Sequence, residues 1–471
     1  MNDSQRMLRQ LAWTYFWLLL FEGAFRKWIT PGLSSVLLLI RDPVVIMLYA
    51  AALGQNVFPF SVFTAATGLL AALSLATSVA GYGTMGITLY GIHADFLHLP
   101  LIVLLPKIFT RKDVARIGLM MLIISVPMLL LSIVQFKGGP ESYWNVGAGG
   151  TVGGQLYAAA GKVRVSGTFS FVTGMVSYIS ISAAFVLYGL MSRRIYPKLV
   201  LMAALPSLIV TLVISGSRSA VAQVAIVCVL VILMSFQRPE AFGAALKPLI
   251  LTVACCSALT YMTPIFDEGL AVHKARFESA GGVKEGMVDR FFGELAGGFN
   301  TLFVAPTLGY GIGLGTSAGA QMLSGRTGFM LGEGEWDRVL YESGPFIGGA
   351  YLLLRIFMAI HMTITALQSY ARGQPLSLLL LSTVLVGLVT SQFGQPTELG
   401  FVTFFSGLTL AAARDDEDEE TAPEAVRSES PPHLPRGLSP YAARLHAAAL
   451  SQEQEQASAP SAPSPSVAAE K

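Results

Sequence analysis

Charged residues are scarce in this chain. Only 13% of its 471 residues are Asp, Glu, Lys or Arg, whereas 53% are hydrophobic and the mean hydropathy is +0.60. A soluble core cannot hide that much apolar surface, so this composition excludes an ordinary soluble globular protein. Most of the apolar side chains must face lipid, and we expect a multi-pass membrane protein.

Cysteine is scarce as well. The chain has 3 cysteines, Cys228, Cys255 and Cys256, and all of them fall in apolar segments. There a thiol behaves as a small hydrophobic group and rarely meets a partner. We therefore expect no disulfide, no metal site and no cofactor.

Three further features are missing. No small-residue cleavage pattern follows the first apolar segment, so we expect that segment to remain as a helix rather than to be removed as a signal peptide. No internal repeat typical of transporters is evident. Carboxylates and cations are mixed between residues 267 and 338, which excludes a nucleic-acid surface because such a surface needs one dominant positive sign.

Apolar runs of the length that crosses a bilayer recur along the chain. Their number predicts an all-α bundle of about twelve membrane-spanning helices. They lie near residues 11–28, 35–53, 61–80, 89–109, 115–136, 168–191, 197–214, 220–236, 246–262, 343–365, 375–391 and 397–413.

Lys and Arg cluster in short connections near residues 107–116, 193–198, 238–247 and 372, which fall on one side if the spans alternate. The positive-inside rule makes that side cytoplasmic. Both termini are then cytoplasmic. The loops at about 137–167 and 266–341 face outward, the second one between the ninth and tenth spans.

A change of composition after Ala413 divides the chain into a membrane domain, 1–413, and a tail, 414–471. The tail opens with an acidic run and continues with Ala, Pro, Ser, Glu and Gln. Such a segment cannot bury enough apolar surface to offset the entropy of ordering, so we expect a disordered cytoplasmic tail.

Two cationic motifs stand at the expected outward boundary. Arg218 lies in a break between two spans, flanked by serines. An arginine there is costly unless it has a function, although contact with lipid phosphates or a helix cap is the alternative. Lys162 and Arg164 precede Ser166-Gly-Thr-Phe169, where the next span is expected to open, and a cation beside a helix N-terminus makes an anion site. Nonspecific contact with lipid headgroups is the alternative there.

The large outward segment carries three further signals. Apolar residues recur every four positions in 284–299, which predicts an amphipathic helix. Arg290 on this helix is a candidate for substrate contact. Alternating glycines in 309–315, with Gly311 and Gly313 at the centre, allow backbone amides to approach a phosphate, or allow close helix packing.

At the end of this segment, helical spacing puts Glu335, Arg338 and Glu342 on one face. If that face looks into the bundle, Glu335 is a candidate base or acceptor-orienting group, and Glu342 and Trp336 are candidates for substrate contact. An ordinary surface ion pair is the alternative.

In this order, the features resemble the O-antigen ligase and polymerase superfamily of bacterial envelope polysaccharide enzymes, over roughly 13–413. The markers are Arg164-Val-Ser-Gly-Thr-Phe169, Ser217-Arg218-Ser219, the glycine loop 309–315 and the entry at 335–344. The segments 22–28 and 93–100 look like features of a branch that includes exopolysaccharide polymerases.

The resemblance implies a GT-C-like architecture in the bacterial inner membrane and a metal-independent glycosyltransferase. In such enzymes an acceptor hydroxyl attacks the first sugar of a chain carried on undecaprenyl pyrophosphate, on the outward face. Arginines stabilise the departing pyrophosphate, which implies that Arg164 and Arg218 contact the donor and that Arg338 is a third candidate. The implied partners are the lipid-linked donor and acceptor, membrane lipids, and chain-length regulator or export proteins.

One departure from the family pattern favours polymerisation over ligation. Many ligases have a His in the outward loop shortly before the next span, whereas this chain has Glu333, Glu335 and Trp336 there. His93 and His98 are expected to be structural hydrogen-bonding residues. The alternatives are a ligase-type transferase and a flippase or transporter of lipid-linked oligosaccharide.

Overall fold

The computed structural model describes residues 3–79, 81–192, 195–237, 250–251, 254–255, 258, 264–279, 289–325, 328, 330–332 and 334–414. The tail expected at 414–471 lies outside this part of the chain, apart from Arg414. Among the described residues the regular secondary structure is helical, apart from a single antiparallel β-bridge between Tyr157 and Val163. The all-α prediction is confirmed.

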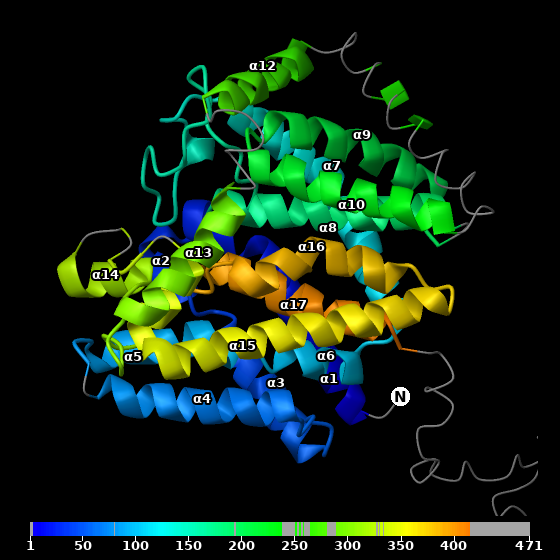
Figure 1. The fold of residues 1–471 in the computed structure, drawn as a ribbon. Helices are drawn as coiled ribbons and strands as arrows, with labels where there is room; N and C mark the ends of the chain where they lie inside the picture. The colour runs from blue at the N-terminus through cyan, green and yellow to red at the C-terminus, as the bar shows by residue number, and fades with distance from the viewer. Residues whose placement is uncertain are drawn as a thin grey trace, which may run out of the picture. The chain divides into compact units, whose positions relative to one another are not determined.

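Figure 1 shows the order and arrangement of the helices. They are α1 (Asp3–Ala24), the π-helix η1 (Phe25–Ile29), η2 (Pro31–Leu33), α2 (Ser34–Leu37), α3 (Asp42–Gly54), α4 (Val62–Ser78), α5 (Met85–Ile92), the π-helix η3 (His93–Leu97), α6 (Leu101–Ile108), α7 (Arg111–Lys137), η4 (Tyr143–Asn145), α8 (Val172–Met191), α9 (Lys198–Ile214), α10 (Arg218–Gln237), α12 (Pro264–Glu278), α13 (Asp289–Val304), α14 (Ser317–Ser324), α15 (Glu335–Ala371), α16 (Leu376–Thr390) and α17 (Pro396–Ala412).

Helices α8 and α17 lie at the centre of the bundle. Residues 399–412 of α17 and the following Ala413 are all buried, and so are most residues of α8. A helix that is apolar and covered all round must be surrounded by others. In Figure 1, α7, α9 and α10 lie beside α8, and α16 packs between α8 and α15.

Within the part of the chain that the structure describes, five helical segments are long and apolar enough to cross a membrane: Pro31–Gly54, Arg111–Lys137, Val172–Met191, Arg218–Phe236 and Glu335–Ala371. A sixth candidate is the pair Met85–Leu97 and Leu101–Ile108, bent by 47°. Other expected spans form shorter apolar helices such as α4, α9 and α16. Several helices of membrane type are therefore present, whereas the count of about twelve stays a prediction.

The expected outward loop at 266–341 is largely helical where the structure describes it. Helices α12, α13 and α14 occupy much of it, and α15 begins at Glu335, eight residues before the span start expected at 343. Local spacing of apolar residues predicted only one helix in this segment. The others are short or polar, so their helical state depends on packing against the bundle.

Basic residues from distant segments gather at one end of the bundle. Arg111 at the start of α7 donates to the carbonyl of Ala412 at the end of α17 (3.3 Å). Arg9 of α1 pairs with Asp113 (3.3 Å). Arg372 after α15 donates to the carbonyl of Ala413 (3.0 Å). The basic connections at Arg111 and Arg372 therefore share one end of the fold with the N-terminal helix, as their charge predicted.

Candidate functional site

Arg164 and Arg218 are brought together by backbone contacts. The break between α9 and α10 turns at Gly216, whose φ is +60°, and Arg218 opens α10 directly afterwards. The amide of Val165 donates to the carbonyl of Ser215 (3.3 Å), which holds the segment containing Arg164 against this break. The two arginines that the resemblance singled out therefore lie on neighbouring segments.

Helix α12 adds a third arginine. The guanidinium of Arg218 donates through Nη1 to the carbonyl of Arg276 (3.3 Å), and Arg276 donates to the carbonyl of Ala158 (3.3 Å). Lys162 pairs with Glu268 of α12 (3.0 Å) and lies 4.7 Å from the ring centre of Phe136. We call Lys162, Arg164, Arg218 and Arg276 the cationic cluster.

Arg218 has no counter-charge among the described residues, unlike Arg26, Arg41 and Arg338. Its side chain is half-buried, and no carboxylate among the described residues lies within ion-pair distance of it. Its one hydrogen bond there is to a neutral carbonyl. A guanidinium has five N–H donors, so most of those of Arg218 are left for water or a ligand. This geometry suits an anion.

The anion site expected from the start of α8 is wrong in one respect. Helix α8 begins at Val172, not at Thr168, because residues 166–169 form a turn. The buried ammonium of Lys27 donates to Ser166 Oγ (3.0 Å) and to the carbonyls of Gly167 (2.8 Å) and Phe169 (3.0 Å). The helix therefore begins eight residues after Arg164 and not directly behind the motif. Lys27 belongs to the segment 22–28 named above, but nothing in the sequence pattern indicated that it contacts the turn at 166–169.

A second charged group is fully buried around Arg338. The guanidinium contacts Glu335 (2.8 Å from Nε), Glu342 (2.8 Å from Nη1) and Asp95 of η3 (2.7 Å from Nη2). Helical spacing predicted that Glu335, Arg338 and Glu342 share a face, and they do. Their side chains are at most 1% exposed, so the alternative of a surface ion pair is wrong.

Arg355 completes this group, and it was not identified from the sequence. We call Asp95, Glu335, Arg338, Glu342 and Arg355 the buried ion network. Arg355 lies five turns further along α15 and pairs with Glu335. It also donates to the carbonyls of Leu388 (2.7 Å) and Ser391 (2.9 Å) and stacks on Phe393, 3.9 Å from the ring centre. An arginine deep in an apolar span was the available signal, because such a charge must have a partner.

The buried ion network occupies the groups that the sequence offered as catalytic. Both carboxylate oxygens of Glu335 receive guanidinium N–H groups, and Arg338 faces three carboxylates. In this arrangement neither side chain has a free face for a substrate. The network joins η3, α15 and the connection between α16 and α17. Catalytic roles for Glu335 and Arg338 stay predictions.

The glycine loop directs its amides inward. Gly311 donates to the carbonyl of Glu342 (3.0 Å), and Gly315 donates to Glu342 Oε1 (2.7 Å). At Gly313, where φ is +90°, an added Cβ would lie 2.3 Å from the carbonyl oxygen of Ile87 in α5. These contacts favour the close-packing interpretation of the loop over phosphate binding.

Trp336 and Glu294 fix α13 to the start of α15. The indole of Trp336 donates to the carbonyl of Val389 (3.0 Å), and a Cβ on Gly298 of α13 would lie 2.5 Å from Trp336 Cβ. Glu294 accepts from the first amide of α15 (3.0 Å), and burial raises the pKa of its carboxyl to about 7. Arg290 belongs to α13, but its side chain lies outside the described ones.

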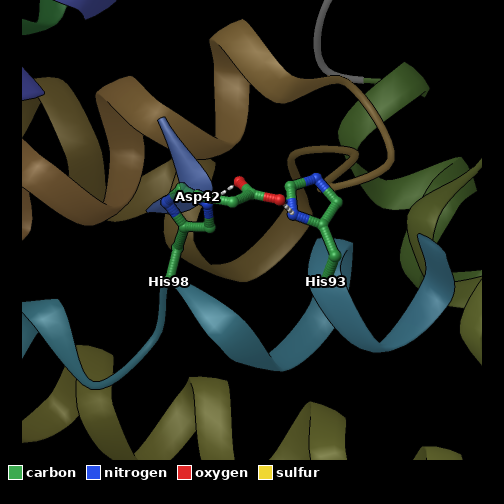
Figure 2. Close-up of side chains that lie close together, drawn as sticks. All are labelled: Asp42, His93 and His98. Atoms are coloured by element: carbon green, nitrogen blue, oxygen red, sulfur yellow. Dashed lines mark hydrogen bonds and ion pairs between the residues drawn. The ribbon is translucent and has the colours of Figure 1, made fainter. Parts of the chain in front are cut away.

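A third polar group contains Asp42, His93 and His98. Figure 2 shows the Asp42 carboxylate between the two imidazole rings, with one oxygen directed at each. His98 also exchanges a hydrogen bond with the hydroxyl of Tyr15 (2.8 Å). His98 makes hydrogen bonds, as expected, and a purely structural role for His93 and His98 stays a prediction. This is the one group of side chains in the described part of the chain with the spacing of metal ligands.

Comparison with known proteins adds no assignment. No protein-family model matches this chain, and no curated protein matches it closely enough to count as a relative.

Proposed function

We propose that this chain polymerises lipid-linked oligosaccharide repeat units at the outward face of the bacterial inner membrane. The observation that carries the proposal is Arg218, a half-buried guanidinium without a carboxylate partner among the described residues, beside Arg164 and Arg276. A cation held without a counter-charge at a helix break between apolar segments is costly unless an anion binds it. The pyrophosphate of a polyprenyl carrier has the required charge and position.

In the proposed reaction an acceptor hydroxyl attacks the anomeric carbon of the donor's first sugar. A new carbon–oxygen bond forms as the bond from that carbon to the pyrophosphate oxygen breaks. The electron pair leaves with the pyrophosphate, and the hydroxyl proton passes to a base or to water. Because negative charge develops on the leaving group, fixed cations such as Arg218 and Arg164 lower the barrier.

The buried ion network has a positioning role in this proposal. Glu335, Arg338 and Glu342 hold the start of α15 against η3 and the glycine loop. Fully paired charges of this kind fix the relative placement of helices, whereas a pyrophosphate contact needs unpaired donors. Arg338 is therefore a weaker candidate than Arg218 for contact with the pyrophosphate of the lipid-linked donor. Glu335 can take a proton from the acceptor hydroxyl only if the buried ion network opens.

The finer topology is part of the same proposal: about twelve spans in a GT-C-like arrangement, both termini cytoplasmic, and the cationic cluster outward. Its support is the end of the bundle where Arg9, Arg111 and Arg372 gather, which has the charge expected of a cytoplasmic face.

The test is product length with purified full-length protein, lipid-linked repeat units and EDTA. We expect chain extension by the wild type and at least a hundredfold loss in Arg218→Ala, equivalent to about 2.7 kcal/mol or more of transition-state stabilisation. Arg218→Lys should recover only part, because an ammonium lacks the planar fork for bidentate phosphate contact.

The matched control is Arg116→Ala, which removes a largely exposed arginine at the basic end of α7. It should extend chains like the wild type. Translocation of the lipid-linked unit without any chain extension would show that the protein is a flippase and not a polymerase. Transfer to a lipid core without lengthening would indicate a ligase. Full activity of Arg218→Ala would show that the cationic cluster is not the pyrophosphate site.

A further inference from the structure

The turn that carries His93 and His98 has an unusual geometry. In an α-helix, residues five apart are rotated by about 140° from one another and do not share a face. Here residues 93–97 form the π-helix η3, with wider i to i+5 turns. Both imidazoles consequently reach the same carboxylate, that of Asp42 at the first position of α3, as Figure 2 shows.

The donor atoms lie as close together as ligands of one ion. Asp42 Oδ2 is 2.7 Å from His93 Nδ1, Asp42 Oδ1 is 3.2 Å from His98 Nε2, and the ligand atoms of all three residues lie within 4.8 Å of one another. Two donors bound to one tetrahedral zinc ion are about 3.3 Å apart. Small side-chain rotations therefore suffice to admit an ion.

His93 contacts the cluster through one ring nitrogen. It is 92% buried, and its Nδ1 lies at ion-pair distance from Asp42 Oδ2, 2.7 Å away. An imidazole nitrogen that faces a carboxylate at this distance needs a proton or a metal ion to hold the pair together. A metal ion that displaces the proton would therefore keep both groups satisfied.

His98 has the outer partner that metal-binding histidines use. Its Nδ1 lies 2.8 Å from the hydroxyl of Tyr15, which leaves Nε2 directed at Asp42. Tyr15 also receives Arg41 Nη1 (3.4 Å). A hydrogen bond at the second ring nitrogen fixes the orientation of a metal-binding imidazole.

The charges around Asp42 leave it without a permanent counter-ion. Arg41, its neighbour in sequence, forms its ion pair with Glu22 (2.9 Å). The recorded ion-pair partners of Asp42, within the described residues, are the two imidazoles and no lysine or arginine. A largely buried carboxylate requires a counter-charge, which is either a proton shared with imidazole or a bound cation.

We propose that Asp42, His93 and His98 bind one divalent transition-metal ion of the zinc class. Two imidazoles and a carboxylate are the donor set that such ions prefer, with water in the remaining position. The ion joins the start of α3 to η3. Because Asp95 in the same turn contacts Arg338, the ion also stabilises the buried ion network. The proposal does not rest on the proposed function, and no step of sugar transfer passes through the metal.

The experiment uses full-length protein in detergent, dialysed for a long period against 1,10-phenanthroline and then against micromolar Zn²⁺. We expect elemental analysis to find about one zinc ion per wild-type chain. Asp42→Asn and His93→Gln should weaken zinc binding at least tenfold. His361→Gln, which removes an exposed histidine from α15, is the control and should bind like the wild type.

Two further measurements keep the proposal testable if those variants fold poorly. Zn²⁺ should raise the melting temperature of the stripped wild type. Tyr15→Phe, which keeps the ring but loses the bond to His98, should bind zinc about 10- to 100-fold more weakly. No retained zinc in folded wild type, or equal retention in wild type, Asp42→Asn and Tyr15→Phe, would overturn the proposal and leave a hydrogen-bonded cluster.

Discussion

At the scale of single residues, two arginines show how environment decides what a guanidinium can do. Arg338 contacts three carboxylates and is completely buried, whereas Arg218 is half-buried and donates to one neutral carbonyl. The first has no charge left for a ligand, and the second retains most of its donors. Sequence motifs marked both as functional. Their partners separate a positioning residue from a candidate catalytic one.

Glu294 supplies a prediction about pH. Burial raises the pKa of its carboxyl from an ordinary 4.5 to about 7. Because the folded-state pKa lies above the unfolded one, the folded state binds more protons, and stability falls as pH rises from about 4.5 to 7. Relative to Glu294→Gln, the wild type should lose roughly 1 kcal/mol of stability over this window, after allowance for partial exposure.

Thermal unfolding between pH 5 and pH 8 measures this difference. The exposed Glu278→Gln on α12 serves as the control and should follow the wild-type curve. Parallel curves for wild type and Glu294→Gln would show that Glu294 does not titrate in this range.

At the scale of elements, helix breaks rather than helices position the polar groups. Arg218 follows the break at Gly216, and α15 is interrupted at Gly344, where φ is +74°. His93 opens the π-turn η3 and His98 directly follows it. At Gly344 an added Cβ would lie 2.3 Å from the carbonyl oxygen of Thr307. Only glycine allows the connection before the glycine loop to approach α15 so closely.

Gly313→Ala tests the packing role of the glycine loop. A methyl group there would meet the Ile87 carbonyl of α5, and the left-handed backbone would be strained as well. We expect a loss of roughly 1–3 kcal/mol in stability, measured as a lower melting temperature and lower protein level in the membrane. Gly139→Ala, with open space around its Cβ, should have little effect. A stable Gly313→Ala protein that fails only in substrate binding would restore the phosphate-binding interpretation.

At the scale of the whole molecule, the basic end of the bundle makes a prediction about sidedness. A reporter fused after Arg372 should be cytoplasmic, because the connection is basic and lies with Arg9 and Arg111. A reporter fused after Gly325, at the exposed end of α14, should be external. The measurement is the activity of a fused enzyme that works on only one side. A cytoplasmic signal at Gly325 would place the cationic cluster on the cytoplasmic side and contradict the proposed outward site.

The sequence by itself determined the helical class, the presence of helices apolar enough to span a membrane, and the shared face of Glu335, Arg338 and Glu342. These properties follow from composition and from the 3.6-residue period, which are local. It also placed Arg164 and Arg218 as candidates through motifs that the structure brings together.

Only the tertiary structure decided which charges are neutralised. Asp95 and Arg355 lie far from Arg338 or Glu335 in sequence but contact them, and Lys27 reaches the turn before α8. The same holds for the helices in the segment expected to be a loop. No local period specifies such contacts, because they depend on which helices pack together once burial makes every unpaired charge costly.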